Sequence, residues 1–183
     1  MRFELALLFF QGKSLLDIGP YTGALMEMAS RLGFPKIVGL DIHRHSGLSL
    51  PPGAEFELCD VTNMKFATSS FDTICALEII EHLPVESVVP AIEKIREVAK
   101  GRIIYSLPFK EKFPLFKQED PTGHKQSFDE AKIFRLFPKA YFTLAEAGLG
   151  APWIIIIEDA VRPAKTREFK LSSAKIILRA LNP

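Results

Sequence analysis

The sequence is poor in cysteine, in net charge and in long apolar runs, and each shortage excludes a class of protein. Its 183 residues include only two cysteines, Cys59 and Cys75, both in apolar strand-like segments and neither in a Cys-x-x-Cys motif. That usage excludes a disulfide-built secreted scaffold and indicates reduced thiols in a cytoplasmic protein. The net charge of +1 gives no overall electrostatic attraction for a polyanionic partner.

The apolar start of the chain, MRFELALLFF, raises the question of a signal peptide or a membrane anchor. The run is too short to span a bilayer, and Glu4 interrupts it. It also lacks the small-residue pattern of a signal-peptide cleavage site. We therefore expect no membrane segment, and a short helix over residues 1–12 that covers the core.

Short β-rich runs alternate with helical patterns along the chain, which is typical of a parallel sheet with crossover helices. The predicted strands are residues 14–18, 36–42, 54–61, 71–80, 101–108, 140–148 and 152–161. Apolar residues at helical spacing predict helices over residues 23–33 and 84–101, with Gly33 and Gly101 as stops. A further helix is predicted over residues 127–138, with Ser127 as its N-cap. We expect a single domain over residues 1–183.

Two segments stand apart from this alternation. Residues 109–127 form a long polar and aromatic stretch, the length of a lid or binding segment. Its aromatic and basic side chains suit an apolar or planar acceptor that bears an acidic group, or a flipped base, or they anchor the loop to the core. They are Phe109, Phe113, Phe116, Lys110, Lys112 and Lys117. From Arg162 onward, six Lys and Arg face one acid, Glu168. This basic tail is predicted to be a helix over about 165–181, as a solvated face or as an RNA contact.

Four predicted strands end in an acidic residue: Asp17, Asp41, Asp60 and Glu78. Ligands of open parallel sheets bind beyond the carboxyl ends of the strands. Asp41 follows Gly19 by 22 residues, close to the spacing of the acid that binds a ribose in dinucleotide folds. Asp60 is placed to accept from an adenine amine. The alternative for any one of these aspartates is a helix N-cap or a turn residue.

The motifs LLDIGPYTG, IVGLDI, LCDV, FDTICALEIIEHL and VAKGRIIYSLP follow one another in order between about residues 12 and 160. Together they resemble the class I S-adenosylmethionine-dependent methyltransferases, particularly the small-molecule type whose fourth strand ends in E-x-x-E-H-L. The resemblance implies a Rossmann-like, doubly wound α/β sheet of seven strands in the order 3-2-1-4-5-7-6. Helices would cover both faces, and the last strand would be antiparallel. A nicotinamide site fits less well, because the turn carries G-x-x-x-G rather than G-x-G-x-x-G.

The resemblance also implies S-adenosyl-L-methionine as cofactor, S-adenosyl-L-homocysteine as product, and a role for each matched position. Gly19 and Gly23 would form the turn beside the methionine part of the cofactor, oriented by Asp17. Asp41 would bind the ribose, and Ala76 and Leu77 would approach the methionine amine through their backbone. The full predicted cofactor set is Asp17, Gly19, Tyr21, Gly23, Asp41, Ile42, Asp60, Val61, Ala76 and Leu77.

Tyr21 departs from the family pattern, because it stands where the family carries a third glycine. Glycine there permits positive φ and a close approach of the cofactor. The tyrosine ring either swings out over the pocket and helps to cover the methionine end, or it fills the site. We predict that binding is retained.

Methyl transfer is an in-line displacement, in which a protein base is needed only when the acceptor must lose a proton. The candidate catalytic residues are Glu81, His82 and His124; for His82 the alternative is a helix cap, and for His124 a surface loop residue. His43 and His45 are interpreted as rim residues. No metal site is expected, because no further His, Cys or acid is spaced to complete one.

These observations favour a methyltransferase acting on a small-molecule acceptor. One alternative is a methyltransferase acting on RNA or protein, with the basic tail as RNA contact. The other is a catalytically silent cofactor-binding or interaction subunit, for which Tyr21 and the short N-terminal helix are the reasons. A homo-oligomer or a partner subunit is compatible with all three.

Overall fold

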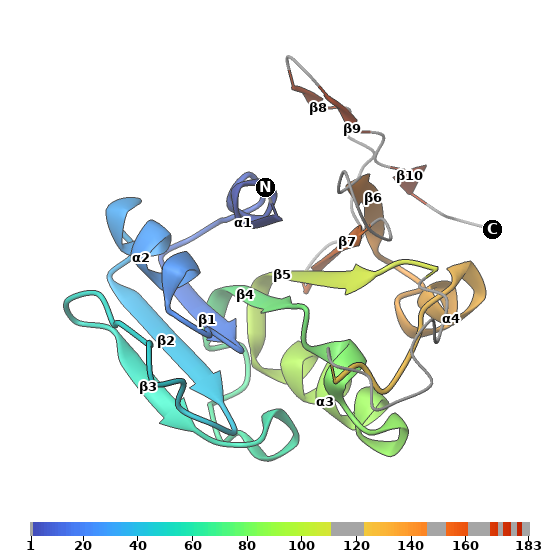
Figure 1. The fold of residues 1–183 in the computed structure, drawn as a ribbon. Coiled ribbons are helices and arrows are strands. Elements are labelled where there is room, and N and C mark those ends of the chain that lie inside the picture. Colours follow the sequence, from blue (N-terminus) through green and yellow to red (C-terminus); the bar gives the residue numbers. More distant parts are fainter. Residues whose placement is uncertain are drawn as a thin grey trace.

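The computed structural model describes residues 2–110, 123–145, 153–160, 169–171, 174–176 and 179–180. It shows one large mixed sheet with helices on both faces (Figure 1). The main strands are β1 Ser14–Ile18, β2 Lys36–Asp41, β3 Glu55–Leu58, β4 Phe71–Leu77, β5 Ala99–Pro108, β6 Tyr141–Ala145 and β7 Trp153–Asp159. The helices are α1 Arg2–Leu7, α2 Ala24–Arg31, α3 Val85–Val98 and α4 Glu130–Leu136, with short 3-10 turns η1 Val61–Asn63 and η2 Ile80–His82.

The sheet order confirms the predicted topology. The seven main strands run 3-2-1-4-5-7-6, and a short strand β10, Arg179–Ala180, adds antiparallel to β6 at the edge. Strands β1 to β5 pair in parallel, while β7 is antiparallel to both β5 and β6. The apolar β4 lies at the centre, between β1 and β5, as its composition predicted.

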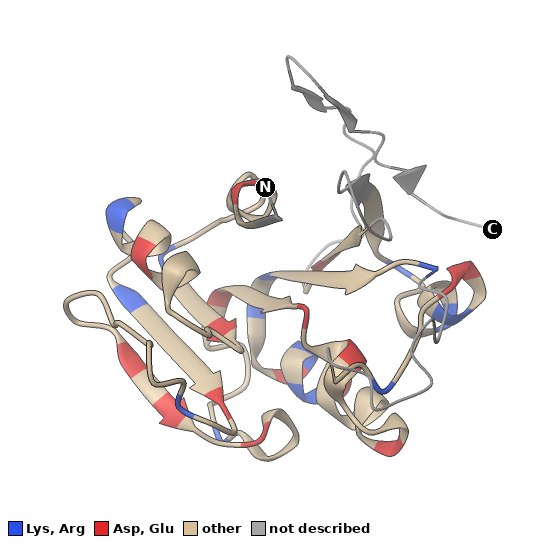
Figure 2. Cartoon of the chain, in the orientation of Figure 1, with Lys and Arg blue, Asp and Glu red and all other residues tan. Residues whose placement is uncertain are grey.

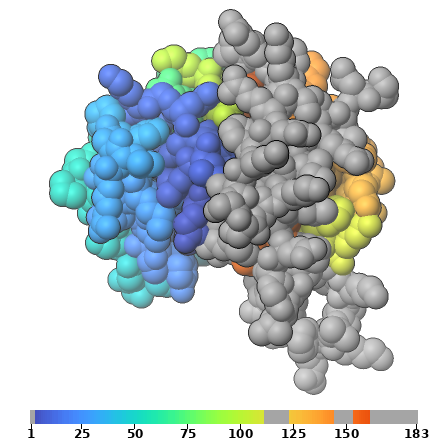
Figure 3. Space-filling view, turned by 90° about the horizontal axis from the view of Figure 1, so that it is seen from above, coloured from blue at the N-terminus to red at the C-terminus, as the bar shows by residue number. Residues whose placement is uncertain are grey.

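The two faces of the sheet have separate cores. In β4, Ile74 and Ala76 belong to the core under α3 and α4, whereas Cys75 and Leu77 belong to the core under α1 and α2. This follows from the period-two alternation of a strand that is buried on both faces. Seen from the α1 and α2 side, the N-terminal third forms one continuous surface (Figure 3). Within the described ranges, no helix combines the length and apolarity needed to cross a membrane.

Several element boundaries differ from the predictions, and three at helices have a clear local description. Helix α3 ends at Val98 rather than at Gly101, because Ala99 already has extended backbone and pairs with Phe71. A Cβ on Gly101 would lie 2.3 Å from the Asp72 carbonyl oxygen, so this glycine permits close strand approach rather than stopping a helix. Helix α4 is capped by Asp129, whose carboxylate accepts from the Lys132 amide, and not by Ser127. The N-terminal helix covers Arg2–Leu7 instead of residues 1–12.

The predicted helix over about 165–181 is wrong for the described residues of the tail. Phe169–Leu171 and Ala174–Ile176 form an antiparallel pair, β8 and β9, and Arg179–Ala180 is β10. The sequence of each member of that pair alternates apolar, lysine, apolar, which is the period of a strand. The same apolar residues also fit a helical stripe, and the prediction followed that longer period.

Most of the predicted lid over 109–127, including Phe113 and Phe116, lies outside the described residues. Phe109 is buried in the core under α3 and α4, which supports an anchoring role for this residue. Cys59 and Cys75 are both free thiols; Cys75 is buried, whereas Cys59 is only partly covered.

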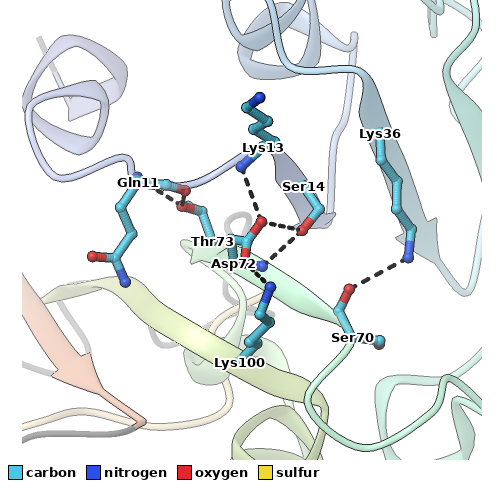
Figure 4. Close-up of polar contacts among 8 residues, drawn as sticks. All are labelled: Gln11, Lys13, Ser14, Lys36, Ser70, Asp72, Thr73 and Lys100. Carbon is cyan, nitrogen blue, oxygen red and sulfur yellow. Dashed lines mark hydrogen bonds and ion pairs between the residues drawn. The ribbon is translucent and has the colours of Figure 1, made fainter.

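The amino-terminal ends of the strands carry a compact polar cluster centred on Asp72 (Figure 4). The Asp72 carboxylate accepts from the Lys13 amide and from the Ser14 hydroxyl, both at 2.9 Å, and it pairs with the Lys100 ammonium at 3.0 Å. Beside it, the Thr73 hydroxyl exchanges two hydrogen bonds with the Gln11 backbone. These bonds tie the segment before β1 to β4 and β5.

Candidate active site

The opposite, carboxyl-terminal edge of the sheet contains a pocket of about 860 Å³. Acidic residues lie at or near the carboxyl ends of β1, β2 and β4 and in the loop after β3 (Figure 2). The pocket is lined by residues 17–22, 40–43, 59–61, 77–79 and 82–84, together with Phe3 and Lys125. The edge at which ligands of open α/β sheets bind is therefore hollowed in this protein.

Asp17, near the end of β1, lines this pocket as a buried carboxyl that is 3% exposed. Within the described part of the chain, its Oδ2 atom has no hydrogen-bond partner. Burial disfavours the charged form and raises the pKa of Asp17 to about 8. A carboxyl held in this way will gain stability from any donor or cation that enters the pocket.

The turn after β1 needs its two glycines for different reasons. Gly19 has φ +74°, and its amide donates to the Leu40 carbonyl at 2.8 Å. A Cβ at this position would lie 2.0 Å from Cδ1 of Ile79. Gly23 precedes α2 with φ +85°, and a Cβ there would lie 2.2 Å from the Ser49 carbonyl oxygen. Gly19 lines the pocket, whereas Gly23 supports the turn from behind.

Tyr21 lies on the pocket wall with its ring turned outward. Its backbone has φ +49°, the left-handed conformation that a glycine would adopt at no steric cost. The ring is 65% exposed and packs against His45, with 4.1 Å between ring centroids. The tyrosine therefore keeps the glycine-like backbone of the turn and leaves the pocket open.

Asp41 and Asp60 line the pocket, as predicted, and each also accepts a local hydrogen bond of the kind expected for a turn or cap residue. Oδ1 of Asp41 accepts from the His43 amide at 3.0 Å. Oδ1 of Asp60 caps η1 by accepting from the Thr62 amide at 2.8 Å and from its hydroxyl at 2.6 Å. Both aspartates nevertheless line the pocket, and between them Ile42 presents a side chain that is 55% exposed.

At the end of β4, only Leu77 of the predicted pair Ala76 and Leu77 lines the pocket. Leu77 and Glu78 line the pocket, whereas Ala76 is fully buried within the sheet. Glu78 has φ +57°, and the Ser106 hydroxyl donates to its carboxylate at 2.8 Å. The Glu78 amide donates to the Ser106 carbonyl at 3.0 Å, which fixes the turn that leads into η2.

The three candidate catalytic residues come together at one end of this pocket. Glu81 is fully buried, and each of Glu81, His82 and His124 offers a ligand-type atom within 4.8 Å of the other two. The two imidazole rings meet edge to face, with 4.8 Å between centroids. His82 lines the pocket directly, as does Lys125, the residue after His124.

Sequence reasoning missed Lys125 and Phe3 as pocket residues. Lys125 reaches the pocket because its amide donates to the Glu81 carbonyl at 2.8 Å, a contact across 44 residues that no local pattern encodes. Phe3 belongs to α1, whose apolar residues the sequence pattern assigned to the core. The only signal for Lys125 was its position next to His124.

Comparison with known proteins agrees with this arrangement. Residues 2–147 match the family model described as a methyltransferase domain. A ubiquinone biosynthesis O-methyltransferase, a mitochondrial protein of Dictyostelium discoideum, is 31% identical in a matched region that covers 40% of this chain and 28% of that protein.

Two solved structures share the fold at low sequence identity. A SAM-dependent methyltransferase from Archaeoglobus fulgidus superposes with a TM-score of 0.70 at 16% identity, covering 86% of this chain and 91% of that one. The 1,6-didemethyltoxoflavin-N1-methyltransferase of Burkholderia thailandensis, solved with 1,6-didemethyltoxoflavin and S-adenosylhomocysteine bound, has a TM-score of 0.62 at 15% identity, covering 80% and 70%. Because the family model spans most of the chain and the predicted strand order is present, this protein belongs to the methyltransferase-domain family.

Proposed function

We propose that this chain transfers the methyl group of S-adenosylmethionine to a small-molecule acceptor. The observation that carries the proposal is the division of one pocket into two chemically different ends. Asp41, Ile42 and Asp60 line the end formed by β2 and β3. His82 and Lys125 line the end beyond β4, and Asp17 lies beneath the turn that both ends share.

The residues of the pocket fit S-adenosylmethionine. Carboxylates at Asp41 and Asp60 suit ribose hydroxyls and an adenine amine, and exposed Ile42 offers an apolar surface to a base. Asp17, buried and with an unpartnered oxygen, suits the positively charged amine of the methionine part. Gly19 permits the close backbone approach that this part of the cofactor requires.

When bound, S-adenosylmethionine supplies a methyl group whose bond to a positively charged sulfur breaks as its bond to the acceptor forms, leaving S-adenosylhomocysteine. The chain positions the acceptor and, where the acceptor carries a proton, removes it. His82 faces the pocket and has the side-chain chemistry for proton removal near neutral pH. Glu81 and His124 lie close enough to orient it.

The outward ring of Tyr21 supports an active enzyme over a silent subunit. A silent subunit would be favoured by a ring that occupied the cofactor end, and the ring instead contacts His45 at the rim. A small-molecule acceptor is supported by one similar structure, since the Burkholderia thailandensis 1,6-didemethyltoxoflavin-N1-methyltransferase was solved with 1,6-didemethyltoxoflavin bound. RNA binding by the basic tail stays a prediction from sequence.

The test is calorimetric titration of the purified protein with S-adenosylmethionine and then with S-adenosylhomocysteine. We expect micromolar binding of both, weakened about 10- to 100-fold in Asp41→Ala, since a hydrogen bond to a charged group is worth about 1.5–3 kcal/mol. Glu57→Ala is the matched control, because Glu57 is an exposed acid on neighbouring β3 that does not line the pocket. A folded protein that binds neither compound would contradict the proposal.

A further inference from the structure

We propose that Glu81, His82 and His124 form a binding site for a divalent cation of the zinc class. The site itself stands on the geometry of these three residues. Its role in catalysis rests on the proposed function. No metal site is predicted from sequence, because His124 is 42 residues from His82 and no short ligand motif joins them.

The donor set and its spacing match a metal site that is nearly assembled. Two imidazoles and one carboxylate are common ligands of zinc and of similar transition metals. Their ligand-type atoms lie within 4.8 Å of one another. Metal–ligand bonds of about 2.0–2.2 Å place neighbouring ligand atoms about 3–4 Å apart. Side-chain rotations that move the ligand atoms by on the order of 1 Å would therefore bring all three to bonding distance of one cation.

Hydrogen bonds hold the two segments that supply the ligands against each other. The Lys125 amide donates to the Glu81 carbonyl at 2.8 Å, and the Gln126 side chain donates to the Leu83 carbonyl at 2.8 Å. His82 Nδ1 lies 3.2 Å from the Gly123 carbonyl oxygen. These contacts flank His124 on both sides, so its position beside Glu81 and His82 is built into the backbone.

The same contacts set the state of the His82 ring. A carbonyl oxygen only accepts, so the bond to Gly123 requires the proton on Nδ1 and leaves the lone pair on Nε2. A backbone carbonyl that receives one ring N–H while the other nitrogen binds metal is the usual support of a metal-ligating histidine. The ring is therefore in the tautomer that a metal needs.

Burial and exposure in the cluster favour an open, catalytic type of site. Glu81 is fully buried, so a cation beside it would add positive charge next to a carboxylate removed from water. His82 lines the pocket, so the remaining coordination positions would face the acceptor end. Three protein ligands with an open position are typical of catalytic zinc sites. Two imidazoles favour a zinc-class cation over magnesium, which prefers oxygen ligands.

Such a cation narrows the acceptor to a compound with a hydroxyl group. An acceptor oxygen bound to the cation would lose its proton to solvent near neutral pH: the O–H bond breaks, and the oxygen keeps the electron pair. That oxygen then attacks the methyl group in the proposed reaction. The cation would thus do the work otherwise assigned to an imidazole base, while His82 holds it in place.

The first measurement uses the full chain after removal of metal with a chelator. We expect Zn²⁺ alone, titrated in a calorimeter, to bind one equivalent. We also expect Co²⁺ to give the visible absorption bands of a bound ion. His124→Ala should lower the Zn²⁺ affinity by at least about tenfold, and Glu81→Gln should do the same. His43→Ala is the matched control, because His43 lies on the pocket rim outside the cluster and should leave the Zn²⁺ affinity unchanged.

Binding that is absent from the wild type, or equal in the wild type and His124→Ala, would overturn the proposal. His124 is only partly buried, so its variant keeps the test valid if Glu81→Gln fails to fold. Titration of His124→Ala with S-adenosylmethionine separates the two proposals. Loss of Zn²⁺ with retained cofactor binding supports the metal site. Zn²⁺ binding by a wild type that binds no cofactor would refute only the proposed function.

Discussion

Two aspartates on neighbouring strands, Asp72 and Asp17, lie at opposite ends of the sheet in opposite electrostatic states. Asp72 accepts from the Lys13 amide and pairs with Lys100, and these bonds lower its pKa to about 2. Asp17 is more deeply buried, and burial raises its pKa to about 8. Both lie within the β1 and β4 region, so the difference comes from their burial and their partners and not from the strands that carry them.

The comparison separates the end of the sheet that stabilises the fold from the end that binds. At the amino ends, the Asp72 carboxylate is matched by the Lys13 amide, the Ser14 hydroxyl and the Lys100 ammonium (Figure 4). At the carboxyl ends, Asp17 retains an unpartnered oxygen within the described residues, beside a pocket of about 860 Å³. Buried polar groups without partners cost stability, and proteins retain them at functional sites.

The largest expected effect is on the stability of the free protein in Asp17→Asn. Because the folded-state pKa of Asp17 is raised, its stabilising contribution is complete below pH 4 and is lost as the pH rises to about 8. The amide does not ionise, so the variant should match the wild type near pH 4. It should exceed the wild type near pH 8 by up to about 5 kcal/mol in the free energy of unfolding. Urea denaturation at both pH values measures this.

The same variant should bind S-adenosylmethionine about tenfold more weakly, since it removes a charge that the ligand's amine would face. A variant that gains stability and loses affinity indicates a residue kept for binding. Equal stability of Asp17→Asn and wild type at pH 8 would show that water already hydrates the ionised Asp17 carboxylate. The difference in electrostatic state between Asp17 and Asp72 would then disappear.

Asp72→Asn should give the opposite pair of results. The lowered pKa of Asp72 contributes stability that is present above pH 4 and lost as the pH falls toward 2. The variant should therefore be less stable than the wild type by about 2 kcal/mol at pH 6 and by about half of that at pH 3. Its affinity for S-adenosylmethionine should be unchanged, because Asp72 does not line the pocket.

Urea denaturation at the two pH values is again the measurement. Lys100→Gln, which removes one partner and leaves the carboxylate, is the control and should cost less than Asp72→Asn, because the Lys13 amide is the largest cause of the lowered pKa. A stability difference that does not depend on pH would locate the effect in packing rather than in charge.

The sequence predicted the strands well and placed Asp41 and Asp60 where the pocket is found, because both depend on short-range patterns. Each parallel strand reads as an apolar run, and Asp41 and Asp60 follow their strands directly. The errors at the end of α3 have a tertiary cause: Ala99 and Gly101 continue a helical pattern, but Ala99 pairs with Phe71 and Gly101 lies close against Asp72, which draws both into β5. Tertiary pairing overrides local propensity at such positions.

The acceptor end was only partly predictable, because it is assembled from contacts between distant segments. Glu81 and His82 are visible in the motif after β4, but their proximity to His124 depends on the bond between the Lys125 amide and the Glu81 carbonyl. The partner state of Asp17 is likewise a property of the folded pocket. Residue types indicated candidates at this end, while the structure shows which of them meet.

The smallest expected effect is at Tyr21, the position that departs from the family pattern. Tyr21→Gly removes the backbone strain of a side chain held at φ +49°, which stabilises the folded state. It also increases the conformational entropy of the unfolded chain, which lowers stability, and each of these opposing contributions is about 0.5–1 kcal/mol. The free energy of unfolding should therefore change by less than about 1 kcal/mol.

Because the ring is 65% exposed and packs on His45, S-adenosylmethionine affinity should stay within about threefold, as measured by calorimetry. Tyr21→Phe keeps the ring and the backbone conformation and is the matched control. If affinity falls tenfold in Tyr21→Gly and not in Tyr21→Phe, the ring contributes to binding by closing over the bound cofactor.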